Sequence, residues 1–434
     1  MDEPQEARSA IVVGGGVIGA ACALRLQQSG IACTLVDEAR ATPPSSWGNA
    51  GHIATEQTRP LASGAVIRAI PKRLFWFGGP VDLRWRDAAA WLPWMARYVR
   101  ASAPARYRHG HLVLSRLLQE AMPAWRRLAA DLGQPDLLIE SGHLVLWEST
   151  APVARGRADW HDPGAAQCRA IDETRLGELR ARFTVPLAGG LSFTGTGQVR
   201  DPALVLTALH QAFRDNGGVP RNDIVTALVP DQFRPGVVLA TGEQLKADLV
   251  VVCAGANSKA LMESEGAPAP LIAERGYHVE APLDGDWPLP PTVFEDRSTI
   301  VTRFGDRLRI SSFVEFGRPA TAPDPRKWHR LEQHIQALGL PMKRPLSRWM
   351  GARPTLPDYL PAIGTVRPAN NIVYAFGHQH LGLTLAPITA EIVADLVRGR
   401  PPAQDPRPFD LARFAPPARR AGKTAALTPL LRRS

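Results

Sequence analysis

Two histidines one residue apart, His378 and His380, lie in the stretch "GHQHLGLTLAP" at residues 377–387. An imidazole can bind a metal ion or exchange a proton near neutral pH. No third ligand is spaced with this pair as in known zinc sites, so we expect no metal site. One of the two, for which we favour His380, lines a substrate pocket in our interpretation, and packing within the loop is the alternative. The role of the stretch depends on what the rest of the chain binds.

A glycine-rich turn near the N-terminus gives the clearest chemical signal. In "SAIVVGGGVIGAACALRLQQSGIACTLVDEA" (residues 9–39), Gly14, Gly16 and Gly19 fit the pattern G-x-G-x-x-G between a predicted strand and a predicted helix. The first glycine permits a tight turn, the second lets the backbone approach a pyrophosphate, and the third lets helix and strand pack closely. The pattern predicts a dinucleotide site, and a glycine turn that only packs against a sheet is the alternative.

The ends of this helix and of the following strand complete the predicted site. Val17 and Ile18 begin the helix, whose free N–H groups and partial positive charge suit a pyrophosphate. The side chains of Val17 and Ile18 belong to the core. Asp37 ends the strand eighteen positions after Gly19, and Glu38 follows it. A carboxylate at this place accepts hydrogen bonds from ribose hydroxyl groups.

Later segments favour FAD over NAD. The loop "SSWGNAGHIA" (45–54) is small and polar and can lie along a ribityl chain and a flavin ring, whereas an NAD fold would continue into another regular βα unit. The strand in "LKADLVVVCAGANSKAL" (245–261) runs into Ala254 and Gly255 near the cofactor, and we also place Val225 of "RNDIVTALV" there. No second G-x-G-x-x-G occurs, so we predict a single FAD. The loop residues expected at FAD are Ser45, Ser46, Asn49, Ala50, Gly51 and His52.

Composition narrows the class of protein. The chain has 434 residues, 45% apolar and 21% charged, which suits a globular protein of two domains. Its net charge of +10 is not gathered in a basic run or repeat, so we expect no nucleic-acid partner, while acidic substrates or an anionic membrane surface fit equally well. Four cysteines without a C-x-x-C pair and a polar N-terminus predict a cytoplasmic, reducing location without a secretory signal. No apolar run approaches the roughly 18–20 residues that cross a bilayer.

The order of the predicted elements indicates an α/β chain in which one domain is inserted into another. We expect a Rossmann-like FAD-binding domain of the glutathione-reductase type and an inserted α+β substrate domain on a mixed, mainly antiparallel sheet. The Pro- and Arg-rich tail from Gly399 should wrap the surface or fray. The FAD-binding domain is assigned to 1–60, 190–265 and 350–434, a mostly helical covering segment to 61–135, and the substrate domain to 136–189 and 266–349.

Taken together, these segments resemble a known family. The glycine turn with Asp37, "SSWGNAGH", "VVVCAGANS", "GARPTLPDYLPAIG" and "GHQHLGLT" occur in the order found in FAD-dependent D-amino acid oxidases and dehydrogenases, the DAO family, which includes glycine oxidase. The resemblance covers nearly the whole chain apart from its ends and the Trp-rich helices. Within the family, "SWGNAGHIATEQ", "RGYHVE" and "GHQHLGLTLAP" look most like D-hydroxyproline dehydrogenases.

The resemblance implies roles for individual residues. Gly382, Leu383 and Thr384 would direct backbone N–H groups at the flavin N1–C2=O edge. Pro387 lies in the first turn of the helix that follows, which places the N-cap at Thr384 or Leu385. The matched candidates around the substrate are Arg353 as the carboxylate-binding cation, His52 as a proton acceptor for the amine or a hydrogen-bonding loop residue, and Tyr277, favoured over His278, as pocket wall. Tyr359 stands where relatives carry a small residue, which puts transfer of their substrate range in doubt.

The implied activity is oxidation of a D-amino or D-imino acid by hydride transfer from Cα to flavin N5. The subgroup implies cis-4-hydroxy-D-proline as substrate and Δ1-pyrroline-4-hydroxy-2-carboxylate as product. Glycine, sarcosine or general D-amino acid oxidation, a flavin subunit of a hetero-oligomeric dehydrogenase, and a flavin-binding protein without turnover are the alternatives. The electron acceptor (a quinone, O2 or a partner protein) and the oligomeric state stay open.

The stretch 73–100 raises a further alternative because it mixes tryptophans and phenylalanines with arginines. Interfacial helices combine these residue types, so peripheral docking on the inner membrane surface is one interpretation. Helices that merely cover the cofactor domain are the other.

Overall fold

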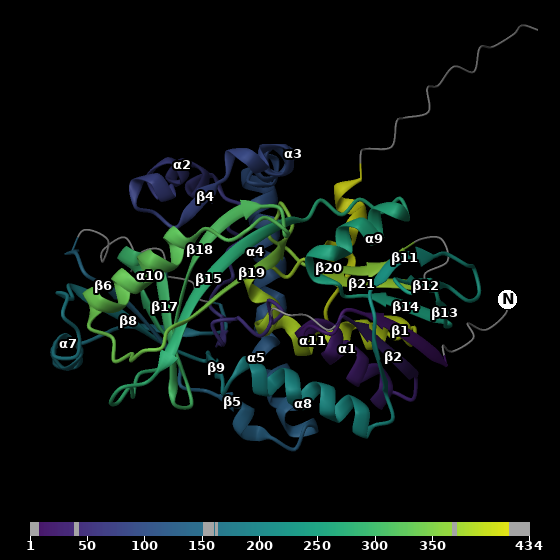
Figure 1. Cartoon of the computed structure of the whole chain (residues 1–434), viewed down its shortest axis with the longest axis horizontal. Coiled ribbons are helices and arrows are strands. Elements are labelled where there is room, and N and C mark those ends of the chain that lie inside the picture. The colour runs from purple at the N-terminus through teal and green to yellow at the C-terminus, as the bar shows by residue number, and fades with distance from the viewer. Residues whose placement is uncertain (1–7, 39–42, 151–159, 161–163, 367–370, 416–434) are drawn as a thin grey trace, which may run out of the picture.

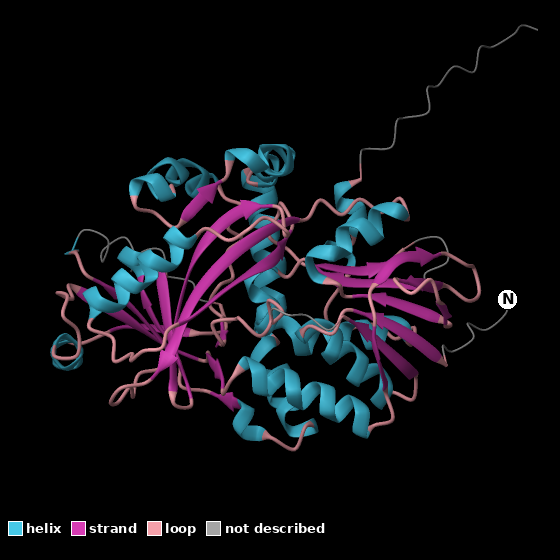
Figure 2. Cartoon of the chain, in the orientation of Figure 1, coloured by secondary structure: helices cyan, strands magenta, loops and turns pink. Residues whose placement is uncertain are grey.

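The computed structural model describes residues 8–38, 43–150, 160, 164–366 and 371–415, and it consists of two lobes that are each built on a large sheet (Figures 1 and 2). The first lobe, on the right in Figure 1, contains the glycine turn. The second lobe, on the left, contains the long strands from the middle of the chain. The expectations for the extreme N-terminus and for the tail beyond residue 415 fall outside the described residues.

The first lobe is organised around a six-stranded sheet with the order β10-β2-β1-β14-β21-β20. Strands β10 through β21 pair in parallel, and β20 is antiparallel at the edge. The strands β1, β14 and β21 are apolar runs rather than alternating patterns because both faces of a parallel sheet are covered. The strands are β1 (Ser9–Val13), β2 (Ala32–Asp37), β10 (Val219–Asn222), β14 (Leu249–Val252), β20 (Ala362–Thr365) and β21 (Ile372–Phe376).

The two faces of this sheet have different covers. Ala10 and Val12 of β1 pack with three helices, whereas the alternating residues Ile11 and Val13 pack toward a three-stranded antiparallel sheet. The helices are α1 (Val17–Gln28), α8 (Pro202–Asp215) and α11 (Gly382–Val397). The small sheet consists of β11 (Val225–Val229), β12 (Gly236–Leu239) and β13 (Gln244–Lys246), with α9 (Ser258–Ser264) beside it. This arrangement places the start of α1 and the start of α11 at the same edge of the lobe.

Helix α8 shows how the sequence sets the first residue of a helix. The Asp201 carboxylate accepts a hydrogen bond from the Ala203 N–H at 2.8 Å, and Pro202 occupies the first helical position. An acceptor side chain at the N-cap and a proline at N1 satisfy or remove N–H groups that have no partner within the helix.

The second lobe contains a nine-stranded, mainly antiparallel sheet with the order β19-β15-β18-β17-β16-β6-β8-β7, in which β4 also pairs with β18. Only the β16–β6 and β4–β18 pairs are parallel, so the predicted mixed, mainly antiparallel sheet is present. Helices α7 (Glu173–Arg180) and α10 (Pro325–Leu338) pack on it with apolar side chains. Its strands are β4 (Val81–Leu83), β6 (His143–Trp147), β7 (Gln167–Ala170), β8 (Gly189–Thr194), β15 (Ile272–Pro282), β16 (Thr292–Phe294), β17 (Thr299–Phe304), β18 (Arg307–Gly317) and β19 (Ser347–Thr355).

The strand pairing moves two of the expected domain boundaries. Strands β8 and β19 pair within the nine-stranded sheet, so the beginnings of the segments 190–265 and 350–434 lie in the second lobe. A fourth, three-stranded sheet consists of β3 (His52–Ile53), β9 (Gly197–Val199) and β5 (Leu138–Ile139). Alternation of side chains identifies a strand but does not reveal the sheet to which it belongs, which explains the difference.

The covering segment is mostly helical, as expected, with one addition. The short strand β4 joins the edge of β18 and fixes the segment to the second lobe. The helices are α2 (Gly64–Arg73), α3 (Ala88–Ala101), α4 (Pro104–Gln119) and α5 (Ala121–Asp131), and the 3₁₀ turns are η1 (Phe75–Phe77) and η2 (Trp85–Asp87). In Figure 1, α2, β4 and α3 lie along the upper edge, whereas α4 and α5 run down between the lobes.

The start of α11 corrects the predicted N-cap. The helix begins at Gly382 with Leu381 as N-cap, so the predicted cap at Thr384 or Leu385 is wrong. Pro387 lies inside the helix, where it cannot donate to the carbonyl of Leu383. The indole N–H of Trp125 in α5 donates to that carbonyl at 3.1 Å instead. A distant tryptophan thus allows the helix to begin earlier than its proline suggests.

By length and composition, one helical stretch within the described residues, Gln379–Val397, could span a membrane. Its mean hydropathy of 1.4 contradicts the expectation that no apolar run approaches spanning length. The stretch is 67% buried inside the protein, where α11 packs with α1 and α5, as the core helix of a globular protein does.

Candidate active site

A cavity of about 820 Å³ extends from the glycine turn of the first lobe to the long strands of the second lobe. Its walls come from α1, the loop 44–57, the turn after β14, the strands β15, β18 and β19, and the start of α11. Most of the residues expected from the sequence meet there. They are Gly14, Gly16, Val17, Ile18, Glu38, Ser45, Ser46, Asn49, Ala50, His52, Ala254, Gly255, Tyr277, Arg353, His380, Gly382 and Leu383.

Five expected residues do not line this cavity, for different reasons. Gly19 lies under the turn, and a side chain there would place Cβ 1.8 Å from the Gly14 carbonyl oxygen. Gly51, with φ +76°, packs under Phe304, and Val225, which is partly buried at the start of β11, packs against the core below the sheet. Asp37 and Thr384 are the other two, and Thr384 accepts the N–H of Ala54 through its hydroxyl oxygen at 3.0 Å.

The glycine turn has the geometry of a backbone cradle. Gly14 has φ +101°, and a Cβ there would lie 2.6 Å from the carbonyl oxygen of Cys253, so only glycine fits. Gly16 is the N-cap of α1, and the N–H of Val17 donates to the Ser46 hydroxyl at 3.0 Å. The first turn of α1 thus directs N–H groups at the cavity beside a hydroxyl, which is the donor set that a pyrophosphate requires.

The acid at the end of β2 lies close to the same turn. A Cβ on Gly15 would come within 2.8 Å of the Asp37 carboxylate, so the carboxylate lies against the turn, while Glu38 faces the cavity. Either residue can accept hydrogen bonds from a ribose at this strand end. The donors at α1 and the acceptors at β2 together fit the adenosine diphosphate part of FAD.

The loop 45–54, which the sequence predicts to lie along the flavin, is held in place by a residue that the sequence did not indicate. Arg309 of β18 is buried and donates from Nη1 to the carbonyl oxygens of Trp47 at 3.0 Å and Asn49 at 2.6 Å. Its charge is balanced by Glu280 at 2.7 Å. No local signal could have identified this arginine, because it follows the loop by 260 residues.

Two ring contacts complete the support of this loop. The His278 ring stacks on Trp349 with centroids 4.9 Å apart, and its Nδ1 lies 3.1 Å from the carbonyl oxygen of Gly48. A Cβ on Gly48 would come within 2.2 Å of the Trp349 ring, so this glycine is needed for close approach. The loop therefore rests on side chains from the second lobe.

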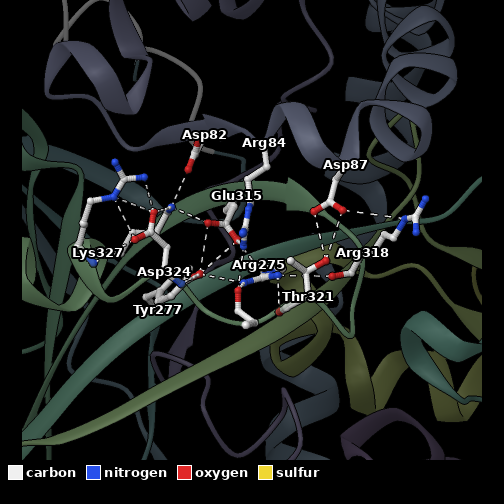
Figure 3. A network of polar contacts seen from close by, with 12 residues as sticks. Asp82, Arg84, Asp87, Arg275, Tyr277, Glu315, Arg318, Thr321, Asp324 and Lys327 are labelled. Atoms are coloured by element: carbon white, nitrogen blue, oxygen red, sulfur yellow. Dashed lines mark hydrogen bonds and ion pairs between the residues drawn. The ribbon is translucent and has the colours of Figure 1, made fainter.

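Tyr277 lines the cavity, as predicted, but its hydroxyl group is engaged elsewhere (Figure 3). It accepts hydrogen bonds from Arg275 Nη2 at 3.0 Å and from the Asp324 N–H at 3.1 Å, and it donates to Glu315 at 3.1 Å. Burial, opposed by these donors and reinforced by the Glu315 charge, raises the pKa of the tyrosine. Tyr277 is therefore a wall of the pocket, and a catalytic role for its hydroxyl group does not fit this geometry.

Arg353 lies in β19 across a gap in the neighbouring strand. A Cβ on Gly276 of β15 would lie 2.2 Å from Arg353 Nη2, so the missing side chain makes room for the guanidinium. Nη1 donates to the Phe313 carbonyl oxygen at 3.0 Å and to Glu274 at 3.3 Å. The side chain is 27% exposed and lines the cavity, and Nη2 and Nε have no protein partner among the described residues. These free donors can bind a carboxylate.

Glu274 and Tyr359 form the support behind this arginine. The Tyr359 hydroxyl group donates to Glu274 Oε2 at 3.0 Å, and the Thr355 hydroxyl donates to the same oxygen at 3.2 Å. The Tyr359 ring packs against Trp94 and Tyr98 and does not line the cavity. Its bulk therefore does not reduce the space for substrate, contrary to the doubt raised by the sequence. Glu274 was not predicted, because only the pairing of β15 with β19 brings it to Arg353.

His52 is not available as a free base. Its Nδ1 lies 2.9 Å from the carbonyl oxygen of Gly197, and its Nε2 lies 3.0 Å from Glu56 Oε1. Both partners only accept hydrogen bonds, so both ring nitrogens carry protons and His52 is an imidazolium. Burial disfavours that charge, but the charge and hydrogen bond of Glu56 outweigh it and raise the pKa of His52. The expected proton acceptor is therefore already protonated.

Glu56 and His143 complete a buried group next to His52. Burial disfavours the Glu56 carboxylate, but the two histidines lower its pKa to about 2, while burial lowers the pKa of His143 to about 3. The rings of His52 and His143 lie 4.5 Å apart. The three side chains offer ligand atoms within 4.8 Å of one another, and in this structure the His52 proton occupies the space between His52 and Glu56. Neither Glu56 nor His143 was identified from the sequence as a contact of His52.

His380, rather than His52, has the properties of a proton acceptor, which are a neutral ring and a free lone pair. Its Nε2 contacts the Gln57 side-chain carbonyl oxygen, which assigns the proton to Nε2 and leaves a lone pair on Nδ1. Burial lowers the pKa of His380 to about 4, so its imidazole is neutral at physiological pH. His378 also borders the cavity, but it is buried and its Nε2 lies 3.0 Å from the Thr389 hydroxyl, a packing contact within the first lobe. The two histidines of the opening motif therefore have separate roles.

Comparison with known proteins agrees with this site. The sequence profile of the family described as DAO, FAD dependent oxidoreductase, matches residues 9–396. The chain is 31% identical over 429 residues to a D-amino-acid oxidase of Bradyrhizobium diazoefficiens, covering 94% of this chain and 99% of the relative. It is 29% identical to a D-amino acid dehydrogenase of Cereibacter sphaeroides, over 96% of this chain and 98% of that protein. The fold is similar to that of glycine oxidase from Geobacillus kaustophilus, with a TM-score of 0.70 at 22% identity over 94% of this chain and 99% of that one.

Proposed function

Because the chain belongs to the DAO family of FAD-dependent oxidoreductases, we propose that it oxidises a D-amino or D-imino acid, with cis-4-hydroxy-D-proline as its preferred substrate. The predicted cofactor FAD and the predicted α/β fold are confirmed by the family and by the fold of its solved relatives. The substrate class depends on one observation, the partly free guanidinium of Arg353 in the same cavity as the glycine turn. A cytoplasmic location is part of the proposal.

The residues present fit FAD along the length of the cavity. The Gly14 turn, the start of α1 and the Ser46 hydroxyl suit the pyrophosphate, and the first turn of α11 directs the N–H groups of Gly382 and Leu383 into the far part of the cavity. Bound FAD supplies a two-electron acceptor for the hydride that leaves the substrate Cα. The remaining chemistry, which is to hold the carboxylate and to accept the amine proton, belongs to the chain.

Arg353 would hold the substrate carboxylate through Nη2 and Nε. Its Nη1 is fixed by Glu274 and by the Phe313 carbonyl oxygen, so the plane of the guanidinium is set before substrate binds. A planar fork with two free parallel donors suits a carboxylate better than the point charge of a lysine. Tyr277 and Phe313 would then form the apolar wall beside the substrate side chain or ring.

His380 would accept the proton that the substrate amine must lose before hydride transfer. A neutral imidazole with a lone pair on Nδ1 is the required state, and its lowered pKa keeps it neutral through the physiological range. Gln57 would orient the ring through its contact with Nε2. His52 would act through its positive charge in the cavity wall, which favours a negatively charged cofactor or substrate.

The choice of cis-4-hydroxy-D-proline is supported by the likeness of "SWGNAGHIATEQ", "RGYHVE" and "GHQHLGLTLAP" to D-hydroxyproline dehydrogenases. The D-amino acid names of two relatives support the wider class. The test is anaerobic mixing of the FAD-loaded protein with cis-4-hydroxy-D-proline, D-proline, D-alanine, glycine and L-proline, with loss of the visible flavin absorbance as readout. We expect the fastest bleaching with cis-4-hydroxy-D-proline.

The same experiment separates the parts of the proposal. Bleaching by D-alanine but not by the prolines would replace the preferred substrate and keep the class, whereas no bleaching by any compound would overturn the class. Arg353→Lys should retain FAD and raise KM roughly 10- to 100-fold, the loss of one or two hydrogen bonds to a charged group. Arg348→Lys, an exposed arginine of the same strand paired with Glu332, is the matched control and should leave KM unchanged. An unchanged KM in Arg353→Lys would remove this residue from the site.

A further inference from the structure

The outer face of the covering segment has an unusual charge. Between residues 64 and 101 the chain has seven basic residues and two acidic ones, Asp82 and Asp87. Both aspartates are buried, whereas five of the cations are exposed. The exposed cations are Arg68, Lys72, Arg86, Arg97 and Arg100. The outer face of α2, η2 and α3 therefore carries positive charges without an exposed carboxylate of its own.

The two aspartates point inward because the second lobe provides their partners (Figure 3). Asp82 contacts Lys327 Nζ at 2.6 Å, and Asp87 accepts a hydrogen bond from the Thr321 hydroxyl at 3.2 Å. The Lys327 ammonium also contacts Glu315 at 2.5 Å, so it occupies the centre of an acidic group that could otherwise hold a cation. These contacts, with the pairing of β4 and β18, fix the segment rigidly to the second lobe.

Large apolar side chains stand on the same segment in an exposed state. Trp76 is 71% exposed, Phe77 74% and Trp85 78%, and Leu92 and Val99 of α3 are more than half exposed. Trp76 and Phe77 follow α2, and Trp85 precedes α3, so the rings lie in the short turns that flank β4. In Figure 1 these elements lie together along the upper edge of the molecule. Exposed rings of this size, beside cations, indicate a surface with a partner.

From the combination of rings and cations, we propose that this face docks on an anionic lipid bilayer. Tryptophan and phenylalanine enter the boundary between headgroups and acyl chains, and arginine and lysine attract anionic headgroups. A nucleic-acid surface would use the cations but would leave the side chains of Leu92 and Val99 without a role. The absence of exposed acidic side chains between residues 64 and 101 also suits a partner that is uniformly negative.

The same segment contributes to the candidate active site. Arg73 at the end of α2 and Pro80 before β4 line the cavity, together with Leu61. Docking would therefore bring the wall of the cavity to the bilayer surface, within reach of an electron acceptor dissolved in lipid. The docking itself does not depend on the proposed reaction, so it is tested without turnover.

The test is co-flotation of the FAD-loaded full chain with vesicles of phosphatidylcholine alone or of phosphatidylcholine with phosphatidylglycerol. We expect binding to the anionic vesicles at low salt, weaker binding at high salt, and little binding to the neutral vesicles. Tryptophan fluorescence should shift to the blue on binding, because Trp76 and Trp85 leave water. Binding that is equal on both kinds of vesicle, or absent from both, would overturn the proposal.

Two sets of variants locate the surface. Arg86→Glu/Arg97→Glu/Arg100→Glu should reduce partitioning on the order of a hundredfold, and Trp76→Ala/Phe77→Ala/Trp85→Ala should reduce it at least tenfold. The matched controls are Phe233→Ala, equally exposed in the first lobe, and Arg214→Glu on α8, and both should bind like the parent protein. FAD content and thermal unfolding show that each variant is folded. Unchanged flotation of both surface variants, or displacement of the protein from vesicles by a DNA oligonucleotide, would contradict a lipid surface.

Discussion

The two walls of the cavity are built in different ways. The wall from the first lobe consists mainly of backbone: Gly14, Gly16 and the start of α1 lie within a few residues of one another. The wall from the second lobe consists of side chains such as Arg353, which reach the cavity only because β15, β18 and β19 pair in one register. A local segment thus specifies the first wall, and long-range pairing specifies the second.

This difference predicts different responses to mutation. A backbone wall fails when a side chain is added, because atoms of the chain occupy the place of the new Cβ. A wall made of side chains loses its interactions with the ligand when one partner of a charged pair is removed, but the backbone keeps its fold. Mutations in the first wall should therefore abolish cofactor binding, and mutations in the second wall should change rate, affinity or pH dependence.

The largest effect is expected from Gly19→Ala. Its Cβ would lie 1.8 Å from the Gly14 carbonyl oxygen, so α1 cannot pack on β1 without moving the turn. We expect a protein without FAD, measured as the ratio of visible flavin absorbance to protein absorbance. Gly177→Ala in α7, where no atom lies within 4 Å of the new Cβ, is the control and should keep FAD and gain roughly 0.5–1 kcal/mol of stability.

If Gly19→Ala does not fold, Gly16→Ala keeps the comparison testable. The nearest atom to a Cβ at Gly16 is the flexible Ser46 hydroxyl at 3.2 Å, so the fold should survive while the pyrophosphate site becomes narrower. FAD affinity should fall with little change in thermal stability. Full FAD occupancy with unchanged affinity in both variants would contradict a cradle made of backbone.

A smaller effect is expected from His380→Gln, which changes a side chain in the turn between β21 and α11 and leaves the backbone of the glycine turn intact. The amide nitrogen of glutamine replaces Nε2–H at Gln57, but the proton-accepting lone pair on Nδ1 is lost. Positioned proton transfer contributes roughly 10²- to 10⁴-fold, so kcat should fall by at least about a hundredfold, with FAD retained. Since more substrate amine is unprotonated at high pH, the variant should recover part of its rate as pH rises.

The parent protein should behave differently across the same pH range. With a pKa of about 4, His380 is neutral above that pH, so its own titration should reduce kcat only as pH falls toward 4. His329→Gln on the exposed face of α10 is the control. A kcat that does not change in His380→Gln, at any pH, would exclude His380 as the proton acceptor.

How much was predictable follows the same division between the walls. The glycine turn and the α8 boundary could be predicted from local patterns, because each depends on neighbouring residues. The FAD cofactor and the mixed sheet were predicted from the order of separate segments along the chain. Arg309, Glu280 and Glu274 could not, since each reaches its partner only through strand pairing across the second lobe. The start of α11 was misplaced because the compensation for Pro387 comes from Trp125.

The role of His52 shows the same limit at the level of protonation. The sequence gives the imidazole and its place in the loop, and both fit a base. The structure adds Glu56 four residues later and the Gly197 carbonyl oxygen from β9, and these acceptors hold two protons on the ring. Whether a histidine is an acid or a base thus depends on its hydrogen-bond partners, which local spacing does not reveal.

The smallest effect, and the sharpest test of this assignment, is expected from Glu56→Gln. In the parent protein the raised pKa of His52 contributes stability that is complete below its unfolded value of about 6.5 and is lost as pH rises through the folded value. The lowered pKa of Glu56 contributes stability above about 4.5, which is lost as pH falls through about 2. In the variant, burial without a counter-charge should leave His52 neutral, so the first contribution disappears.

The variant should therefore be less stable than the parent by about 1–3 kcal/mol near pH 6, and the difference should shrink as pH rises through the raised pKa of His52. Thermal unfolding of both proteins at a series of pH values from weakly acidic to alkaline measures this difference. Glu391→Gln, which removes a part-exposed partner of Arg127, is the control and should give a small difference that does not vary with pH in this range. A large difference that stays constant for Glu56→Gln would mean that His52 does not titrate, and the imidazolium would have to be replaced by a neutral ring.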